Sequence, residues 1–271
     1  MLVLVLVLTE GEIEEFVREG VVRVDEAFPR RVADACRQIL WQASGCHEDA
    51  PSTWTRPVVR VGELALPPFR EAAATEKLTL AYDALVGPGR WLPRGGLGTF
   101  PLRFPSAKAP GDCGWHIDAS FGFEDQPDFM QWRINVASRG RALLMLFLLS
   151  DVGDDDAPTR LRLGSHLDIA RRLAPHGDPG LTLGELASTG FAESAARPEA
   201  LATGPAGTVY LCHPFLVHSA QPHRGRAPRF MAQPALLPAP SRSAAPASPV
   251  ERAIQLALDE QPSSADPLRL R

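Results

Sequence analysis

The sequence predicts a mainly β domain with flanking helices, arranged as an eight-strand, double-sheet jelly roll. From Leu97 onward, the hydrophobic period changes from helical to strand-like, and short apolar runs alternate with Gly and Pro. One of these runs, residues 142–149, is apolar on both faces, as expected for a strand that helices cover on one side and that fills a core on the other. With 271 residues, of which 45% are hydrophobic, the chain can bury a sizeable core.

Composition narrows the classes of partner. The net charge of -4 and the sequence pI of about 6.0 give no sign of a nucleic-acid or membrane-surface partner. Oligomeric state cannot be predicted. The four cysteines fall in no CxxC or paired-finger spacing, which indicates reduced thiols in a cytoplasm. The opening run 1–8 lacks a basic flank and is too short to span a bilayer, so we interpret it as a strand or a buried leader.

The chain is predicted to form a single domain over residues 1–271, in three parts: a helical buttress over about 9–90, a jelly-roll core over about 97–237 and a C-terminal helix over about 249–259. Thr9 to Glu12 has the form of a capping box, and Phe16 and Val17 continue a helical pattern that Gly20 ends. A short strand follows at 21–24. Further helices are expected at 30–44, 71–85, 165–174, 182–188 and 250–258.

The core strands are predicted from their apolar runs and from the turn residues between them. They are expected at 98–104, 115–119, 132–138, 142–149, 159–163, 207–211, 216–219 and 229–237. Two segments are long enough to form loops over a site built on this scaffold, 165–202 and 126–132, and loops in such positions commonly determine specificity.

The stretch Gly111 to Ser120 contains a candidate metal motif. In an extended segment, His116 and Asp118 point to the same face because side chains alternate, so an imidazole lies beside a carboxylate. Such a pair is two thirds of the triad of two histidines and one carboxylate that holds Fe(II) and leaves coordination positions open. A distant histidine should supply the third ligand.

Two histidines in the segment 207–220 are candidates for that ligand. His213 and His218 are separated by an odd number of residues, which places them on opposite faces of an unbroken strand, although Pro214 between them should break or bulge it. Arg229 comes eleven residues after His218, at the head of the next strand, whereas Arg224 comes eleven after His213, inside a turn. An arginine on a strand is better held for bidentate carboxylate binding, so spacing favours His218 with Arg229 without deciding the choice.

Several motifs, taken in order, resemble the phytanoyl-CoA dioxygenase family of Fe(II)- and 2-oxoglutarate-dependent oxygenases. They are Gly-Trp-His116-Ile-Asp118, Leu163-Gly-Ser-His166, His213-Pro-Phe-Leu-Val-His218 and Pro228-Arg229-Phe, together with an amino terminus that is similar over Leu8 to Val24. The resemblance covers roughly residues 8–237. It implies a double-stranded β-helix, with His116, Asp118 and His218 as catalytic iron ligands and Arg229 binding the distal carboxylate of 2-oxoglutarate.

The activity implied by the resemblance is hydroxylation of an unactivated C–H bond of a small molecule, with O2 as oxidant and release of succinate and CO2. Desaturation or cyclisation would need only a different fate of the substrate radical. Asp118 is a carboxylate where halogenating relatives have a small residue, so halogenation is disfavoured. The loop 154–158 departs from the usual family pattern, which leaves the substrate undefined.

Two other functions remain open from the sequence. The same ligands could hold zinc in a cupin-like hydrolase, or the chain could be a non-catalytic jelly-roll binding protein. Individual residues also have structural interpretations. We expect His213 to be a buried, hydrogen-bonded histidine and His166 to cap a helix together with Ser165. Trp115 and Trp132 are expected mainly in the core, and Arg103 is expected in an ion pair, with binding of an anionic substrate as the alternative.

Overall fold

The computed structural model describes residues 7–124, 126–240 and 246–260, and most of the initial run 1–8 lies outside them. Its helices are α1 (Glu10–Glu19), α2 (Arg30–Ser44), α3 (Pro67–Ala73), α4 (Glu76–Val86), α5 (Ser165–Leu173), α6 (Leu183–Ala187) and α7 (Pro249–Asp259). Its strands are β1 (Val21–Val24), β2 (Val58–Val61), β3 (Phe100–Arg103), β4 (Arg133–Ile134), β5 (Leu143–Leu148), β6 (Arg160–Arg162), β7 (Leu181–Thr182), β8 (Glu199–Leu201), β9 (Val209–Cys212), β10 (His218–Ser219), β11 (Met231–Ala232) and β12 (Ala235–Leu236).

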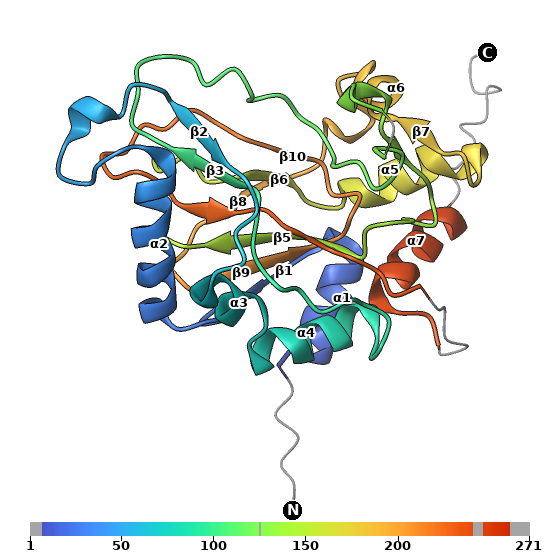
Figure 1. The fold of residues 1–271 in the computed structure, drawn as a ribbon. Helices are drawn as coiled ribbons and strands as arrows, with labels where there is room; N and C mark the ends of the chain where they lie inside the picture. The colour runs from blue at the N-terminus through green and yellow to red at the C-terminus, as the bar shows by residue number, and fades with distance from the viewer. Residues whose placement is uncertain (1–6, 125, 241–245, 261–271) are drawn as a thin grey trace, which may run out of the picture.

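Two sheets form the centre of the molecule. The larger sheet has the antiparallel order β1-β9-β5-β11, and β12 also pairs with β5; the smaller sheet has the order β10-β6-β8. Helices α1, α3 and α4 lie along one side of the larger sheet, and the smaller sheet lies on its other side (Figure 1). This arrangement confirms the predicted mainly β, jelly-roll class with flanking helices.

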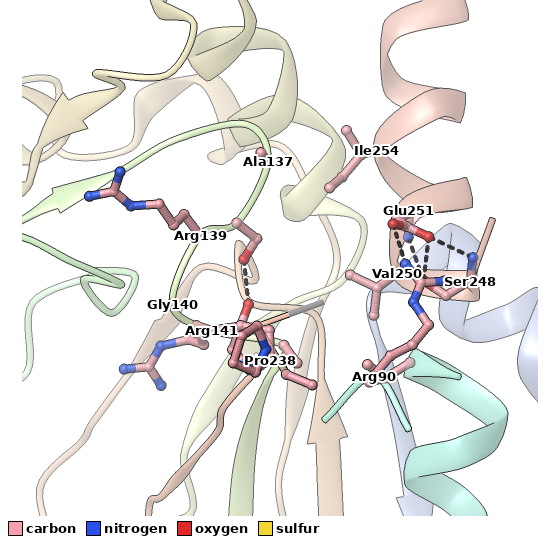
Figure 2. A pocket seen from close by; sticks show the side chains of 15 residues that line it. Arg90, Ala137, Arg139, Gly140, Arg141, Pro238, Ser248, Val250, Glu251 and Ile254 are labelled. Atoms are coloured by element: carbon pink, nitrogen blue, oxygen red, sulfur yellow. Dashed lines mark hydrogen bonds and ion pairs between the residues drawn. The ribbon is translucent and has the colours of Figure 1, made fainter. Parts of the chain in front are cut away.

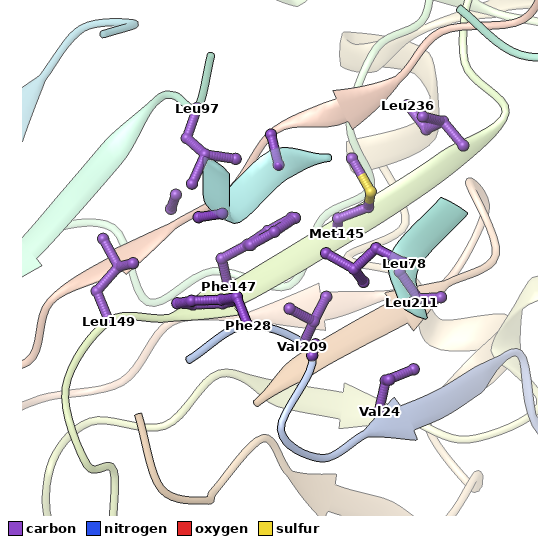
Figure 3. Packing of buried hydrophobic residues seen from close by; sticks show 14 of the residues in the cluster. Val24, Phe28, Leu78, Leu97, Met145, Phe147, Leu149, Val209, Leu211 and Leu236 are labelled. Carbon is purple, nitrogen blue, oxygen red and sulfur yellow. The ribbon is translucent and has the colours of Figure 1, made fainter. Parts of the chain in front are cut away.

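Strand β5 is buried on both faces, as the sequence predicts, and its alternate side chains enter two different cores. Met145 and Phe147 pack with the helices, and Phe147 stacks on Phe28 with ring centroids 5.9 Å apart (Figure 3). Leu144 and Leu146 belong to a second cluster with residues of β6, β9 and β11. The strand therefore separates the helical layer from the interior of the jelly roll.

The helical layer follows the predicted boundaries except at one position. Helix α1 has the expected capping box between Thr9 and Glu12, and Gly20 ends the helix in the left-handed conformation. The single helix predicted at 71–85 is wrong, because α3 and α4 are separate. Thr75 is the N-cap of α4: its hydroxyl accepts from Leu78 N at 3.2 Å and donates to Ala27 O at 2.7 Å.

Several predicted strands are shorter than expected. The segment 115–119 forms no strand, and only His116 makes a bridge, to His218. The predicted strand 132–138 is reduced to β4, and 229–237 is split into β11 and β12 around Pro234, which has no N–H for the ladder. The backbone around the candidate metal motif at His116 and Asp118 therefore has little regular strand pairing. None of the helices in the described part of the chain has the length and apolar character needed to span a bilayer.

Candidate metal centre

A single backbone bridge brings the two predicted histidine ligands together. His116 and His218 exchange two hydrogen bonds, N–H to O, of 2.9 Å each, across more than a hundred residues of chain. Side chains of directly opposed residues lie on the same face, and the two imidazole centroids are 4.3 Å apart. The structure thus places His218, and not His213, beside His116, so His218 is the candidate for the third ligand.

Asp118 completes the cluster. One ligand atom from each of His116, Asp118 and His218 lies within 4.8 Å of the others. Metal–ligand bonds are about 2.1 Å long, so two donors bound to one ion are at most about 4.2 Å apart. The limit of 4.8 Å here is slightly larger, and small side-chain rotations would bring all three donors to one ion. Among the described residues no other group of three histidine, cysteine or acidic side chains meets this criterion.

The ring orientation leaves the metal-facing nitrogens available. The Nδ1–H of His116 donates to Gly114 O at 2.9 Å, and that of His218 donates to Leu216 O at 3.0 Å. Metal-binding histidines commonly use their second nitrogen in this way, which fixes the tautomer and leaves Nε2 as the ligand. Burial, and then the adjacent His116, lower the pKa of His218 to about 4, so the ring is neutral at physiological pH.

Arg141 orients the carboxylate. Its Nη1 lies 3.2 Å from Asp118 Oδ2, whereas Asp118 Oδ1 lies 3.9 Å from His218 Nε2. Burial raises the pKa of Asp118, but Arg141 and the two histidines lower it more, so that the net pKa lies below its ordinary value. One oxygen of the ionised carboxylate thus faces the arginine, and the other faces the histidines.

A second backbone bridge, between Arg103 and Arg229, lies at an arginine-lined cavity beside the histidines. The two residues exchange N–H to O bonds of 3.0 and 2.8 Å. Both side chains are almost fully buried, and they line a cavity of about 460 Å³ together with His116 and His218. Arg229, the predicted carboxylate anchor, therefore lines the same cavity as the two candidate histidine ligands.

The charges in this cavity are not balanced by protein groups. Arg60, Arg103 and Arg229 line it, with Asp112 as the acidic side chain that pairs with Arg60 and Arg103. Arg229 donates to the carbonyl oxygens of Ala157 and Pro101, and its Nε has no partner; Arg103 has two nitrogens without a partner. Burial, and then Arg103, lower the pKa of Arg229 to about 9, which leaves it charged at neutral pH. Buried guanidinium nitrogens without a hydrogen-bond partner favour an anionic ligand.

On its other side the cluster faces an apolar cavity of about 380 Å³. His116 lines both cavities, Asp118 lines only the apolar one and His218 only the arginine-lined one. Both segments that were predicted to form loops over the site line the apolar cavity: Met130 and Trp132 come from 126–132, and Leu183 comes from 165–202. A bound ion would thus be accessible from an anion-binding cavity and from an apolar cavity.

A third cavity, of about 380 Å³, lies behind this site between Arg141 and α7. Figure 2 shows that the guanidinium groups of Arg139 and Arg141 point away from the Arg90 and Glu251 side of this cavity. Arg90 and Glu251 are already paired with each other. This cavity therefore offers fewer unsatisfied groups to a ligand than the arginine-lined cavity does.

His166 and His213 form a buried pair that is not part of the cluster of His116, Asp118 and His218. His213 Nε2–H donates to Val250 O at 3.2 Å and its Nδ1 accepts from Phe215 N, which confirms the predicted structural role. His166 lies against it, with ring centroids 4.8 Å apart, and donates to Val17 O at 3.1 Å. The prediction that His166 and Ser165 cap a helix is wrong: Gly164 is the N-cap of α5, with no side-chain cap bond.

This pair predicts acid lability. Burial is the main cause that lowers the pKa of His166, to about 4, and it also lowers the pKa of His213. Since the unfolded chain takes up these protons near pH 6.5, the free energy of unfolding should fall by about 3 kcal/mol for His166 as the pH falls from about 6.5 to 4. Urea unfolding across this range should show a shallower pH dependence for His166→Gln than for the unsubstituted protein. An unchanged slope in the variant would contradict the assignment.

The structure adds two site residues that the sequence did not reveal. Gln233 donates its amide N–H to His218 Nε2 at 3.1 Å and lines the arginine cavity. Its position four residues after Arg229, on the same face of an extended segment, could have indicated it. Arg141, the second of these residues, has no sequence pattern that could have indicated it.

The two tryptophans predicted mainly in the core line the cavities instead. Trp132 lines the apolar cavity, and Trp115 lines the arginine cavity beneath the guanidinium groups of Arg160 and Arg162, so neither is purely a core residue.

Comparisons with known proteins support the fold. No protein-family model matches the chain, and no curated protein matches it. Among solved structures, the chain is similar to SnoK, a non-heme alpha ketoglutarate dependent carbocyclase from nogalamycin biosynthesis (TM-score 0.53, 14% identity, 85% of this chain and 84% of that chain). It is also similar to HygX from Streptomyces hygroscopicus with nickel, 2-oxoglutarate and hygromycin B bound (TM-score 0.51, 17% identity, 83% and 86%).

A further similar structure is GIG2 (DUF1479) from Candida albicans, with a TM-score of 0.59 and 14% identity over 85% of this chain and 64% of that chain. At these identities the likeness shows the fold. It agrees with the double-sheet architecture predicted from the sequence, while membership of the phytanoyl-CoA dioxygenase family stays a prediction.

Proposed function

We propose that the protein is an Fe(II)- and 2-oxoglutarate-dependent oxygenase acting on a small molecule. The observation that carries this proposal is the position of the His116, Asp118 and His218 cluster between an arginine-lined cavity and an apolar cavity. An oxygenase of this kind needs a metal, an anionic cosubstrate and an organic substrate in contact around one point. SnoK, an alpha ketoglutarate dependent carbocyclase, and HygX, solved with 2-oxoglutarate bound, have a similar fold.

The donor set fits Fe(II). Two neutral imidazoles and one carboxylate form the triad that non-heme iron oxygenases use, and this triad leaves coordination positions open. His116, His218 and Asp118 would hold the ion through Nε2, Nε2 and a carboxylate oxygen, because their other polar atoms are engaged by backbone carbonyls and by Arg141. The hydrogen bond from Gln233 to His218 Nε2 would be exchanged for the metal bond.

The arginine-lined cavity fits 2-oxoglutarate, a dicarboxylate. Arg229 would bind its distal carboxylate through the nitrogen that has no protein partner, and Arg103 would add a second cationic donor. Asp112 keeps Arg103 in place and offsets part of the positive charge. These interactions would hold the cosubstrate at one end, so that its other end reaches the side of the cavity where His116 and His218 lie.

Fe(II) with 2-oxoglutarate and O2 supplies an oxidant strong enough to break an unactivated C–H bond, with succinate and CO2 as coproducts. The protein residues position the substrate and exclude water, and the apolar side chains around Asp118 serve both purposes. Hydroxylation is the proposed outcome. SnoK is described as a carbocyclase, so this fold also accommodates ring closure.

Two alternatives are less well supported. A zinc hydrolase could use the same three ligands, but it has no need of a buried, unpaired guanidinium beside the metal. A non-catalytic binding protein would not need a carboxylate held by an arginine with one oxygen facing two histidines. The oxygenase accounts for the ligands and for both cavities.

Turnover of the cosubstrate tests the proposal. In air, protein loaded with Fe(II) should convert 2-oxoglutarate slowly to succinate and CO2 even without its substrate, and protein loaded with Zn(II) should not. Succinate measured by mass spectrometry gives the result directly. Ester hydrolysis by the zinc form, with no succinate from the iron form, would instead favour the hydrolase.

The Arg141 ion pair gives a sharper prediction. Arg141→Gln removes the group that holds Asp118 Oδ2, so the carboxylate loses its fixed orientation. The dissociation constant for Fe(II) should rise by about 10- to 100-fold, the usual effect of losing a partner of a ligand. Anaerobic metal titration measures it, and Arg139→Gln, two residues away on an exposed side chain, is the matched control. Equal affinities for both variants would rule out this role of Arg141.

A further inference from the structure

We infer that the apolar cavity beside Asp118 binds a largely apolar, ring-bearing molecule with one hydrogen-bond acceptor oxygen, and that this is the substrate class of the proposed oxygenase. The inference rests on the proposed function only in calling the ligand a substrate. The binding itself follows from the lining of the cavity.

Aromatic and aliphatic side chains dominate the cavity wall. Phe123 and Trp132 meet edge to face, with centroids 5.4 Å apart and planes at 74°. Leu183 and Phe191 come from the insertion between β6 and β8, and the Leu183 N–H donates to Trp132 O at 2.8 Å, which joins the two segments of the wall. Ring edges and faces arranged in this way favour a flat apolar ligand, because aromatic pairs add to the free energy of burying apolar area.

The exposed aromatic side chains that line the cavity also favour an apolar ligand. Phe129 is 58% exposed and Phe123 is 44% exposed, and both line the cavity. Large aromatic side chains exposed together at the rim of a cavity mark a binding site more often than a random surface. An apolar ligand would cover them, which would remove this area from water.

Polar groups in the cavity are few and mostly engaged. The indole N–H of Trp132 donates to Gln126 O at 2.6 Å, and Asp118 pairs with Arg141. A sugar or a nucleotide would lose several hydrogen bonds to water here without replacement, at a cost of about 1–3 kcal/mol for each group. Both Lys77 and Lys108 lie outside the lining, so no lysine is available for a phosphate. Sugars and coenzyme A esters are therefore disfavoured.

One donor remains for the ligand. Arg141 lines the apolar cavity and pairs with Asp118, and its buried Nε has no hydrogen-bond partner. A carbonyl or phenol oxygen of the ligand would accept from it. The volume of about 380 Å³ lies near the lower end for small-molecule sites, so it suits roughly two or three fused rings.

The test uses prodan, a naphthalene with a ketone whose fluorescence shifts to the blue in apolar surroundings, added to protein without iron or 2-oxoglutarate. We expect a saturable blue shift. Phe129→Ala should weaken binding by about 10-fold, the effect of about 1.4 kcal/mol. Ala187→Trp should abolish it by filling the cavity from α6. The matched controls are Leu80→Ala, an exposed apolar residue on α4, and Ser188→Trp, outside the lining, and both should bind as the unsubstituted protein does.

Competition tests the chemical class. 2-Acetylnaphthalene should displace prodan, 2-ethylnaphthalene should do so about 10-fold less well because it lacks the acceptor, and a disaccharide should not displace it. Equal binding by all variants, or displacement by the disaccharide, would overturn the inference.

The two proposals fail in different ways. If prodan does not bind while the iron and 2-oxoglutarate complex forms, the substrate class is wrong and the oxygenase stands. If prodan binds in the cavity and no such complex forms, the assignment of the cavity as a substrate site falls with the oxygenase.

Discussion

His218→Ala is expected to abolish stoichiometric Fe(II) binding and all turnover of 2-oxoglutarate, and His116→Ala and Asp118→Ala should do the same. Each change removes one of the three donors that the structure brings within 4.8 Å. Loss of an outer partner of a ligand commonly weakens metal binding by about 10- to 100-fold, so loss of a ligand itself should exceed about 100-fold. Anaerobic Fe(II) titration followed by equilibrium dialysis measures the change.

His213→Ala is the matched control, because His213 is equally buried and lies in the same segment but outside the cluster. It should keep its iron and instead lower the free energy of unfolding by about 2–4 kcal/mol, since the backbone partners at Phe215 and Val250 lose their hydrogen bonds. If His213→Ala does not fold, His223→Ala serves as a second control. Loss of iron in His213→Ala with retention in His218→Ala would overturn the ligand assignment.

Arg229→Ala should weaken 2-oxoglutarate binding strongly and leave Fe(II) binding unchanged. The guanidinium is 1% exposed and would form a buried, charge-assisted pair with the distal carboxylate. Removing one partner of such a pair costs about 2–4 kcal/mol, which corresponds to a rise of roughly 30- to 1000-fold in the dissociation constant. Calorimetric titration of the iron-loaded protein with 2-oxoglutarate under anaerobic conditions measures this.

Arg94→Ala tests whether the effect is specific. Arg94 is also mostly buried, and it pairs with Glu63 and donates to Ala235 O, away from the cavity. Its loss should affect stability and not cosubstrate affinity. Should Arg229→Ala bind 2-oxoglutarate normally while Arg103→Ala does not, the anchor would be Arg103 and the assignment from strand spacing would be wrong.

The helices could be predicted closely because their signals are local. The capping box at Thr9 and the left-handed Gly20 fix both ends of α1, and α2 has the predicted bounds. The break between α3 and α4 was missed because Thr75 has a helix-compatible neighbourhood in sequence. The hydrogen bond that its hydroxyl accepts from Leu78 N makes it the N-cap, and the bond that it donates to Ala27 O is a long-range contact that the local sequence does not reveal.

The proximity of two side chains in the candidate site could be predicted where alternation along one segment decides the geometry. His116 and Asp118 follow from a spacing of two, and the head of a strand favoured Arg229. The two bridges that join His116 to His218 and Arg103 to Arg229 are long-range pairings, so no local signal identifies them. For the same reason the ion pair of Arg141 with Asp118 and the separation of the two cavities could be found only in the folded chain.

The most direct test of the proposed function is an anaerobic titration of the Fe(II)-loaded protein with 2-oxoglutarate, followed by visible absorption. We predict a weak charge-transfer band that saturates at one equivalent per iron, because the triad leaves positions open for a chelating cosubstrate. Full iron loading without such a band at saturating 2-oxoglutarate would contradict the oxygenase assignment and favour the zinc hydrolase or the binding protein.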